Sequence, residues 1–279
     1  GSVNDEFTTE WFQDAPAVLR NRWAGVMRPL TGATIDQTRS KFIEIWINGD
    51  EGELNIDLGS ITEDVNGNNI YDSEDDRSDG FGNNLLDANE DIGLDQTTDV
   101  SEIGFDPVFK IPRPFDPVSN PDPHADNFEF DPSPGQAGRF QDISYERING
   151  TENNVNDPDV GRRPNTEDIN NSGFLDTSNN FYRYRFNIGP DHPDTSLVAG
   201  GDLNKGNWGA KNSWRMYRIP LNAAAQNPTF GGEIGSPSFA LIEAARIYIT
   251  DVEDPVTVRL ASIQIVGNRW QEDPAGAIT

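Results

Sequence analysis

Three short acidic stretches place oxygen-bearing side chains at the spacing of a calcium-binding loop. In the first, residues 64–75, oxygen side chains occupy positions 1, 3, 5, 9 and 12, and position 7 offers its backbone carbonyl; these residues are Asp64, Asn66, Asn68, Ile70, Asp72 and Asp75. This is the ligand spacing of an EF-hand-type loop, which curls around a hard cation. The loop departs from the strict pattern at position 6, which is Asn69 rather than Gly, and at position 12, where Asp75 is shorter than the usual Glu.

Two further stretches repeat the spacing less completely. Residues 79–90 would use Asp79, Asn83, the Leu85 carbonyl, Asp87 and Glu90, with Phe81 interrupting position 3. Residues 168–179 would use Asp168, Asn170, Ser172, the Phe174 carbonyl and Asp176, and Asn179 closes the loop weakly. The loops carry three, three and two carboxylates, so calcium affinity is expected to fall in that order at equal geometry. The alternative is that these are Asp/Asn/Gly-rich turns whose charges are solvated.

The pattern favours structural calcium over a sensor or an enzyme. A sensor needs a pair of helices that opens on binding, and none is predicted beside these loops. Among 47 acidic residues, two carboxylates lie close together by chance, so a carboxylate pair alone does not indicate a glycosidase. The sequence has no Ser–His–Asp arrangement and no Gly-rich phosphate loop. We therefore expect no catalytic residues.

Composition narrows the class further. The 279 residues carry a formal net charge of −26, which excludes nucleic-acid binding through the protein's own charge. Zero cysteines exclude disulfides and thiolate metal sites, and both histidines, His124 and His192, fall in Pro-containing loop sequence. The acidic excess suits a protein adapted to high salt, a calcium-loaded one, or both. No apolar run reaches the length of about 18 residues that a membrane-spanning helix needs.

The loops must be positioned by β-strands. Period-2 alternation predicts strands at 42–47 and 53–58, joined by a Gly-containing turn, and again at 245–250 and 256–266. We interpret each pair as a β-hairpin. The two pairs are either parts of an internal duplication, over 20–100 and 165–270, or neighbours in one sandwich.

The rest of the chain fits one all-β domain over 3–279. Strands are predicted at 181–188 and 213–219, where Arg183, Arg185, Arg215 and Arg218 are expected on a solvated sheet face. Residues 11–30 suggest a short helix followed by a strand. Eight prolines between 107 and 134 predict an irregular excursion at 104–165. The fold expected is a jelly-roll-like β-sandwich with long acidic, Asn/Pro-rich loops.

The order of several short motifs resembles the SprA family of gliding-motility and type IX secretion proteins. The motifs are WAGVMR (23–28), FIEIW (42–46), LGSITED (58–64), NTEDIN (165–170), YRYR (182–185), YRIP (217–220) and VRLAS (258–262), continuing to Trp270. Together they cover roughly residues 20–270.

The resemblance implies a soluble domain of a very large outer-membrane β-barrel translocon. The expected partners are other domains of the same protein, secretion-system subunits and secreted cargo, and the expected location is the cell envelope, on the periplasmic or extracellular face of the outer membrane. The family supplies no catalytic residues. The alternative function is a carbohydrate-binding module, in which Trp11, Trp46, Trp208 and Trp214 would stack on sugar rings if exposed on one sheet face.

Overall fold

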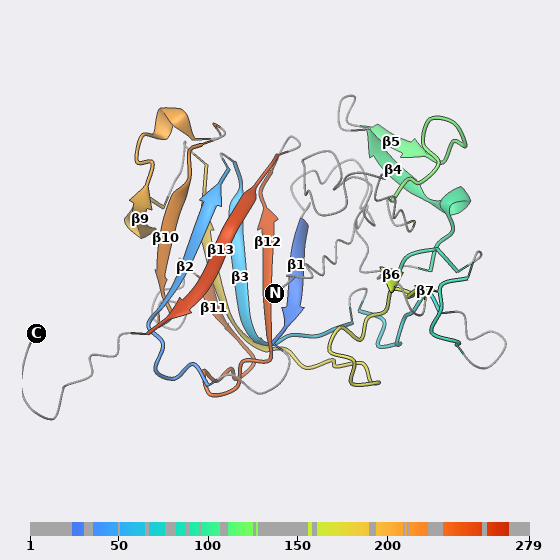
Figure 1. The fold of residues 1–279 in the computed structure, drawn as a ribbon, viewed down its shortest axis with the longest axis horizontal. Helices are drawn as coiled ribbons and strands as arrows, with labels where there is room; N and C mark the ends of the chain where they lie inside the picture. Colours follow the sequence, from blue (N-terminus) through green and yellow to red (C-terminus); the bar gives the residue numbers. More distant parts are fainter. Residues whose placement is uncertain are drawn as a thin grey trace, which may run out of the picture.

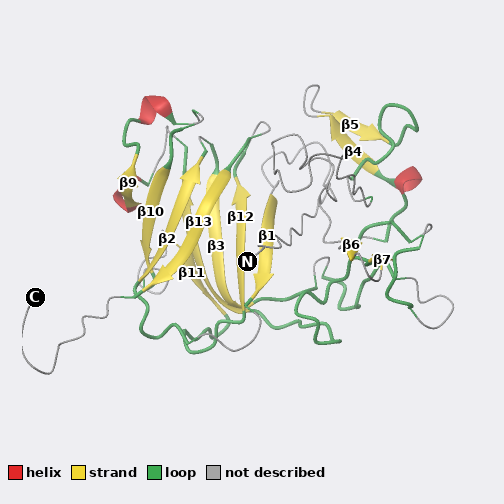
Figure 2. Cartoon of the chain, in the orientation of Figure 1, coloured by secondary structure: helices red, strands yellow, loops and turns green. Residues whose placement is uncertain are grey.

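The structure is a computed structural model that consists almost entirely of strands and loops (Figure 2). The described residues are 24–30, 36–49, 51–64, 67–75, 82–87, 90–94, 96–106, 111–124, 127, 156–157, 161–189, 194–208, 210, 212–222, 231–252 and 256–267. Helical structure within them is limited to three short 3-10 turns: η2 (Asp99–Ser101), η4 (Thr195–Leu197) and η5 (Lys205–Asn207). The all-β prediction is confirmed.

Two antiparallel sheets form the body of the protein (Figure 1). The larger has the order β1-β12-β3-β8-β11, with bounds Ala24–Pro29, Ala244–Thr250, Glu53–Ser60, Asn180–Asn187 and Gly231–Ile234. The smaller has the order β13-β2-β10-β9, with bounds Arg259–Val266, Phe42–Asn48, Arg215–Pro220 and Val198–Gly201. Jelly-roll connectivity is not established by this order and stays a prediction.

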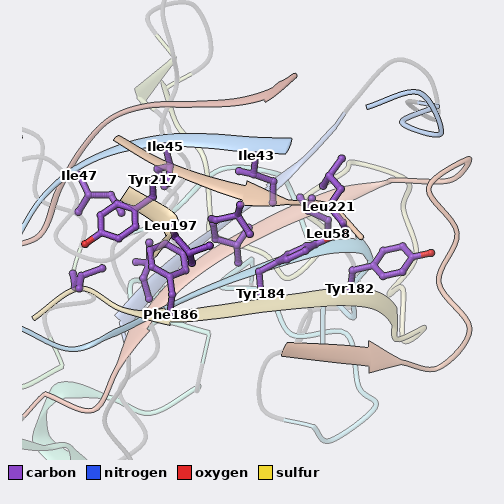
Figure 3. Close-up of a cluster of buried hydrophobic side chains, with 14 of the residues drawn as sticks. Ile43, Ile45, Ile47, Leu58, Tyr182, Tyr184, Phe186, Leu197, Tyr217 and Leu221 are labelled. Carbon is purple, nitrogen blue, oxygen red and sulfur yellow. Dashed lines mark hydrogen bonds between the residues drawn. The ribbon is translucent and has the colours of Figure 1, made fainter. Parts of the chain in front are cut away.

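The hydrophobic core lies between the two sheets because each contributes one apolar face. Ile43, Ile45 and Ile47 of β2 are fully buried, and Figure 3 shows them with Tyr217 on one side of the cluster. Leu58 of β3 with Tyr184 and Phe186 of β8 supplies the other side (Figure 3). The rings of Phe186 and Tyr217 meet at 4.9 Å between centroids. Alternating burial of this kind is what the period-2 sequence pattern predicts.

Both predicted hairpins are wrong. β2 pairs with β10 and β13, whereas β3 pairs with β12 and β8 in the other sheet. The connection after β2 therefore crosses from one sheet to the other, and so does the connection between β12 and β13. Alternation fixes which face of a strand is buried but not which strand lies beside it, and two strands that bury the same core from opposite sheets show the same pattern. The two strand pairs are neighbours in one sandwich.

One arginine prediction is also wrong. Arg185 and Arg218 are exposed and Arg183 is partly exposed, but Arg215 is fully buried. Its guanidinium lies 3.7 Å from the centroid of the Trp208 ring, and it donates to the backbone carbonyls of Gly49 and Ile188. Stacking and carbonyl acceptors replace water around this charge.

The predicted excursion contains short β-elements outside the main sheets. β4 (Ile103–Asp106) pairs with β5 (Ile111–Pro114), and β6 (Asn156–Asp157) pairs with β7 (Gly161–Arg162). In Figure 1 these ladders lie on the β1 side of the sandwich, within the loop region. Of the predicted helix and strand over residues 11–30, the strand is β1, and residues 11–23 lie outside the described residues.

Candidate functional site

The first predicted loop is organised around the carboxylate of Asp64. Its two oxygens accept the backbone N–H groups of Gly67, Asn68 and Asn69 at 2.7, 3.1 and 2.9 Å. Asn69, at position 6, has φ = 59°, the left-handed conformation that the turn needs and that Asn tolerates. The chain therefore curls around this carboxylate.

The predicted donors at positions 5, 7 and 9 lie within the same turn. The Asn68 side chain accepts the N–H of Ile70 and donates to Oδ2 of Asp72 at 2.8 Å. The Ile70 side chain is 61% exposed, so this position serves the loop through its backbone. Asn66 lies outside the described residues.

The third loop repeats this scheme. Asp168 accepts the N–H groups of Ser172 at 2.9 Å and Gly173 at 2.6 Å, and Gly173 has φ = 81°. Asn170 donates to Oδ2 of Asp176 at 2.8 Å. The N–H of Phe174 donates to the Ser172 hydroxyl oxygen at 3.2 Å.

In the second loop, Asp75 accepts backbone N–H groups near the middle of the turn. Asp75 accepts the N–H groups of Asn83 at 2.9 Å and Asn84 at 3.1 Å, the two bonds that correspond to those of Asp168 in the third loop. Asn83 accepts the N–H of Leu85 at 2.7 Å and donates to Asp87 at 3.0 Å. Asp75, which was predicted to close the first loop, thus hydrogen-bonds to the second loop. The predicted head, Asp79, lies outside the described residues.

Two glutamates that the sequence analysis missed join the first and third loops reciprocally. Glu63, directly before Asp64, accepts the N–H groups of Asn170 at 3.2 Å and Asp176 at 3.1 Å in the third loop. Glu167, directly before Asp168, accepts the N–H of Asp72 at 3.0 Å in the first loop. The backbone repeats the exchange, since Glu63 N–H donates to the Asp176 carbonyl and Glu167 N–H to that of Asp72.

A sequence signal for this arrangement exists. Ser/Thr-Glu-Asp occurs at 62–64, 73–75 and 166–168, and in each copy the hydroxyl oxygen accepts the N–H of the aspartate two residues later, at 3.2, 3.1 and 3.0 Å. The second copy contains Glu74, which accepts the N–H groups of Asn165 and Gly93. In each copy the aspartate accepts N–H groups of an acidic loop, and the glutamate accepts N–H groups of a different segment. Three copies of one tripeptide are visible in the sequence, but their pairing is not.

These carboxylates are withdrawn from solvent. Glu63, Glu74 and Glu167 are 3%, 1% and 1% exposed, and Asp168 is 8% exposed. Burial, together with the charges of Asp176 and Asp168, raises the pKa of Glu63 to about 7, against backbone hydrogen bonds that lower it. Burial and the neighbouring carboxylates therefore disfavour the charged form of Glu63, and a bound cation would favour it.

The larger sheet positions the first loop (residues 64–75) and the third loop (residues 168–179), which together are the paired loops. Ser60, the last residue of β3, pairs with Asn180, the first residue of β8. Beyond the strands the contact continues, because Thr62 N–H donates to Asn179 Oδ1 at 3.1 Å and Glu63 N–H donates to the Asp176 carbonyl at 2.7 Å. The first and third loops are thus an outward extension of the β3–β8 ladder.

A further carboxylate group lies at the end of a fourth acidic stretch. Oxygens of Asp99, Glu102 and Asp122 lie within 4.8 Å of one another, and Glu102 is 2% exposed. Counting from Asp91, residues 91, 95, 99 and 102 are all acidic and occupy positions 1, 5, 9 and 12, so the spacing used for the other loops could have identified this one. The backbone N–H of His124 donates to the Glu102 carboxylate at 3.1 Å, whereas His192 lies outside the described residues.

The tryptophans proposed for sugar stacking do not form one exposed face among the described residues. Trp208 is 8% exposed and covers Arg215, while Trp46 and Trp214 are partly buried. Trp11 lies outside the described residues.

Chemically, the loops offer oxygen ligands of the kind that hard divalent cations prefer. The first would supply Asp64, Asn68, the Ile70 carbonyl and Asp72, and the third would supply Asp168, Asn170, Ser172, the Phe174 carbonyl and Asp176. The donor set fits Ca²⁺ better than Zn²⁺, which prefers nitrogen and sulfur ligands.

The chain matches a known protein family. A family model named SprA_N, described as a motility related/secretion protein, matches residues 125–276, more than half of the chain. No curated protein matches. Within the described residues, no helix is long and apolar enough to cross a membrane.

Proposed function

The chain belongs to the SprA_N family of motility-related and secretion proteins, and we propose that it acts there as a non-catalytic structural domain whose acidic loops bind Ca²⁺. Family membership associates the protein with the cell envelope and with a larger secretion system. The proposal extends this to a docking domain that contacts other domains of the same protein, secretion-system subunits or secreted cargo at the outer membrane.

The observation that carries the calcium proposal is the reciprocal pairing of the first and third loops. Glu63 and Glu167 are almost completely buried; Glu63 accepts two backbone N–H groups of the third loop, and Glu167 accepts one of the first. These bonds hold two acidic loops against each other, although their charges repel. Ca²⁺ in each loop would neutralise that repulsion and supply a hard Lewis acid for the oxygen ligands.

The pairing also changes the expected order of affinities. Asp75 is hydrogen-bonded to the second loop, whereas the Glu167 carboxylate accepts the backbone N–H of Asp72, so we count Glu167 with Asp64 and Asp72 in the first loop. Glu63 adds a third carboxylate to the two of the third loop. Each of the paired loops then has three carboxylates, so similar affinities are expected instead of a weaker third site.

Thermal unfolding with and without calcium tests the proposal. A ligand that binds only the folded state stabilises it by about 2.7 kcal/mol at a hundredfold excess over Kd. At about 2–4 °C per kcal/mol, one filled site raises the midpoint by about 5–11 °C. The comparison is made between EDTA and millimolar CaCl₂ at fixed high ionic strength, so that screening is constant. MgCl₂ should substitute poorly, because Mg²⁺ demands a compact octahedral shell.

Matched variants separate calcium binding from local turn structure. Asp64→Ala and Asp168→Ala should each remove a similar part of the calcium-dependent rise. Asp116→Ala is the control, because Asp116 also accepts two backbone N–H groups, from Val118 and Ser119 at 3.0 and 2.7 Å, in an exposed turn outside the loops. This control should leave the calcium response intact. Identical thermal midpoints in EDTA and CaCl₂ would mean that the loops are hydrogen-bonded turns that do not bind calcium.

The carbohydrate-binding alternative has less support, because Trp208 is committed to Arg215 rather than to an open sheet face.

A further inference from the structure

A cavity of about 540 Å³ lies between the edge of the larger sheet and the paired loops. Strand β1 contributes Met27, and the segment after β3 contributes Ile61. With Ala244 of β12 and Ile169 of the third loop, these residues belong to a small apolar cluster separate from the main core. Buried apolar side chains therefore form the floor of the cavity, and its volume falls in the usual range for ligand pockets.

The polar part of the lining is acidic. Glu243, Asp176 and Glu63 contribute carboxyl groups, and no Lys, Arg or His is among the described residues that line the cavity. Glu243 is exposed and accepts a hydrogen bond from the Ser60 hydroxyl, which orients its carboxylate. Leu241, 42% exposed, adds an apolar side chain to the lining.

We propose that this cavity receives the side chain of a lysine or arginine from a partner protein. These side chains have an aliphatic stem and a charged head, so the stem can pack on Met27 and Ile61 while the head meets the carboxylates. A metal ion would gain nothing from the apolar floor, and a purely apolar group would desolvate the carboxylates without compensation. The chain's net charge of −26 also attracts basic partners at long range.

The inference stands independently of calcium binding. Glu63 and Asp176 belong to the paired loops, and Ca²⁺ there would engage part of their charge. Glu243 follows β-bridge residue Ile242 at the start of β12 and lies outside the proposed calcium ligands, so it is the carboxylate on which the test depends.

The chain's two methionines give a direct assay. Met27 lines the cavity, whereas Met216 lies in β10 of the other sheet, so ¹³C-methyl labelling of methionine yields one reporter signal and one internal control. The probes are Nα-acetyl-lysine methylamide and Nα-acetyl-arginine methylamide, titrated to tens of millimolar at fixed ionic strength. Nα-acetyl-norleucine methylamide is the neutral control of similar length. We expect both basic probes to shift the Met27 signal saturably, and Met216 to stay fixed.

Two variants test the two halves of the lining. Glu243→Gln should lower the affinity for the basic probes about two- to fivefold, as expected for loss of an exposed ion pair. Leu241→Ala should lower this affinity because packing against the probe is lost. An unchanged Met216 signal and thermal midpoint show that each variant is folded. Binding should persist in both EDTA and CaCl₂, so failure of the calcium proposal leaves this result interpretable.

Three results would overturn the inference: no shift of Met27, equal binding of the norleucine probe, or no effect of Glu243→Gln. Binding of free spermidine as tightly as the lysine probe at equal concentration would assign the cavity to a small organic cation instead of a partner side chain.

Discussion

Removing the carboxylate of Asp57 should destabilise the larger sheet more than any other single charge deletion in its strands. Asp57 lies at the centre of β3, opposite Arg246 on β12 and Arg183 on β8, and is fully buried. Arg183 donates to both carboxylate oxygens at 2.8 and 2.9 Å, and Arg246 donates twice to Oδ2 at 3.1 and 2.7 Å. One side chain therefore ties three adjacent strands together.

The size of the effect follows from burial. Deleting one partner of a buried ion pair costs about 3–5 kcal/mol, because the remaining charge loses its partner in a poorly solvated site. The Arg183 and Arg246 side chains are 32% and 25% exposed, so they recover part of their hydration after Asp57→Ala. We therefore expect the lower end of the range, about 3 kcal/mol, and a fall in the thermal midpoint of about 6–12 °C.

Urea and thermal unfolding of matched variants measure this loss of stability. Asp57→Asn keeps the side-chain volume and one acceptor oxygen, so its free energy of unfolding should lie between those of the wild type and Asp57→Ala. Glu44→Ala is the control: Glu44 pairs with Arg218 across β2 and β10, but those side chains are 21% and 47% exposed, and such pairs contribute about 0.2–1 kcal/mol. If Asp57→Ala and Glu44→Ala cost the same, the carboxylate does not tie the strands together and the reasoning fails.

Two further variants test close packing in each sheet. Gly25→Ala should destabilise the protein, because a Cβ there would lie 2.4 Å from Cβ of Tyr248, whereas Gly200→Ala should be nearly neutral, because its nearest contact would be 3.7 Å away; their urea midpoints give the comparison. Arg215→Lys should lower the thermal midpoint and change the Trp208 fluorescence, because an ammonium group cannot reproduce the planar stack at 3.7 Å from the Trp208 ring; a wild-type emission spectrum would contradict this.

The strands were predictable from the sequence because burial of one strand face produces a local alternation of apolar and polar residues. Ile43, Ile45 and Ile47 alternate with residues that are less buried, and this pattern alone locates β2. The same rule places Arg215 on the face of Tyr217 and Ile219, yet the expectation that arginines lie in solvent overrode it. Charge is a weaker guide to burial than register when an aromatic ring and two carbonyls are available to receive the guanidinium.

No local sequence pattern indicates which strands pair with each other or which loops contact each other. The acidic loops could be proposed because ligand spacing is local, but that spacing did not reveal that Asp75 accepts the N–H groups of Asn83 and Asn84. The contact between Glu63 and Asp176 spans 113 residues, and that between Glu167 and Asp72 spans 95. A periodicity measured along one segment cannot identify contacts at that separation.

The paired loops and the cavity depend on the same strand ends, which links the two proposals physically. Met27 of β1 is opposite Arg246 of β12, whose other neighbour is β3, and β3 leads through Ile61 into the first loop. Asp176 serves both the third loop and the cavity lining. Ca²⁺ that fixes the loops would thus also fix the acidic wall against the apolar floor of the cavity, and a cation in the third loop would draw Asp176 away from a basic guest. Glu243 would then be the main carboxylate for that guest, so Glu243→Gln should weaken the basic probes more in CaCl₂ than in EDTA; an equal effect in both would show that the two sites act separately.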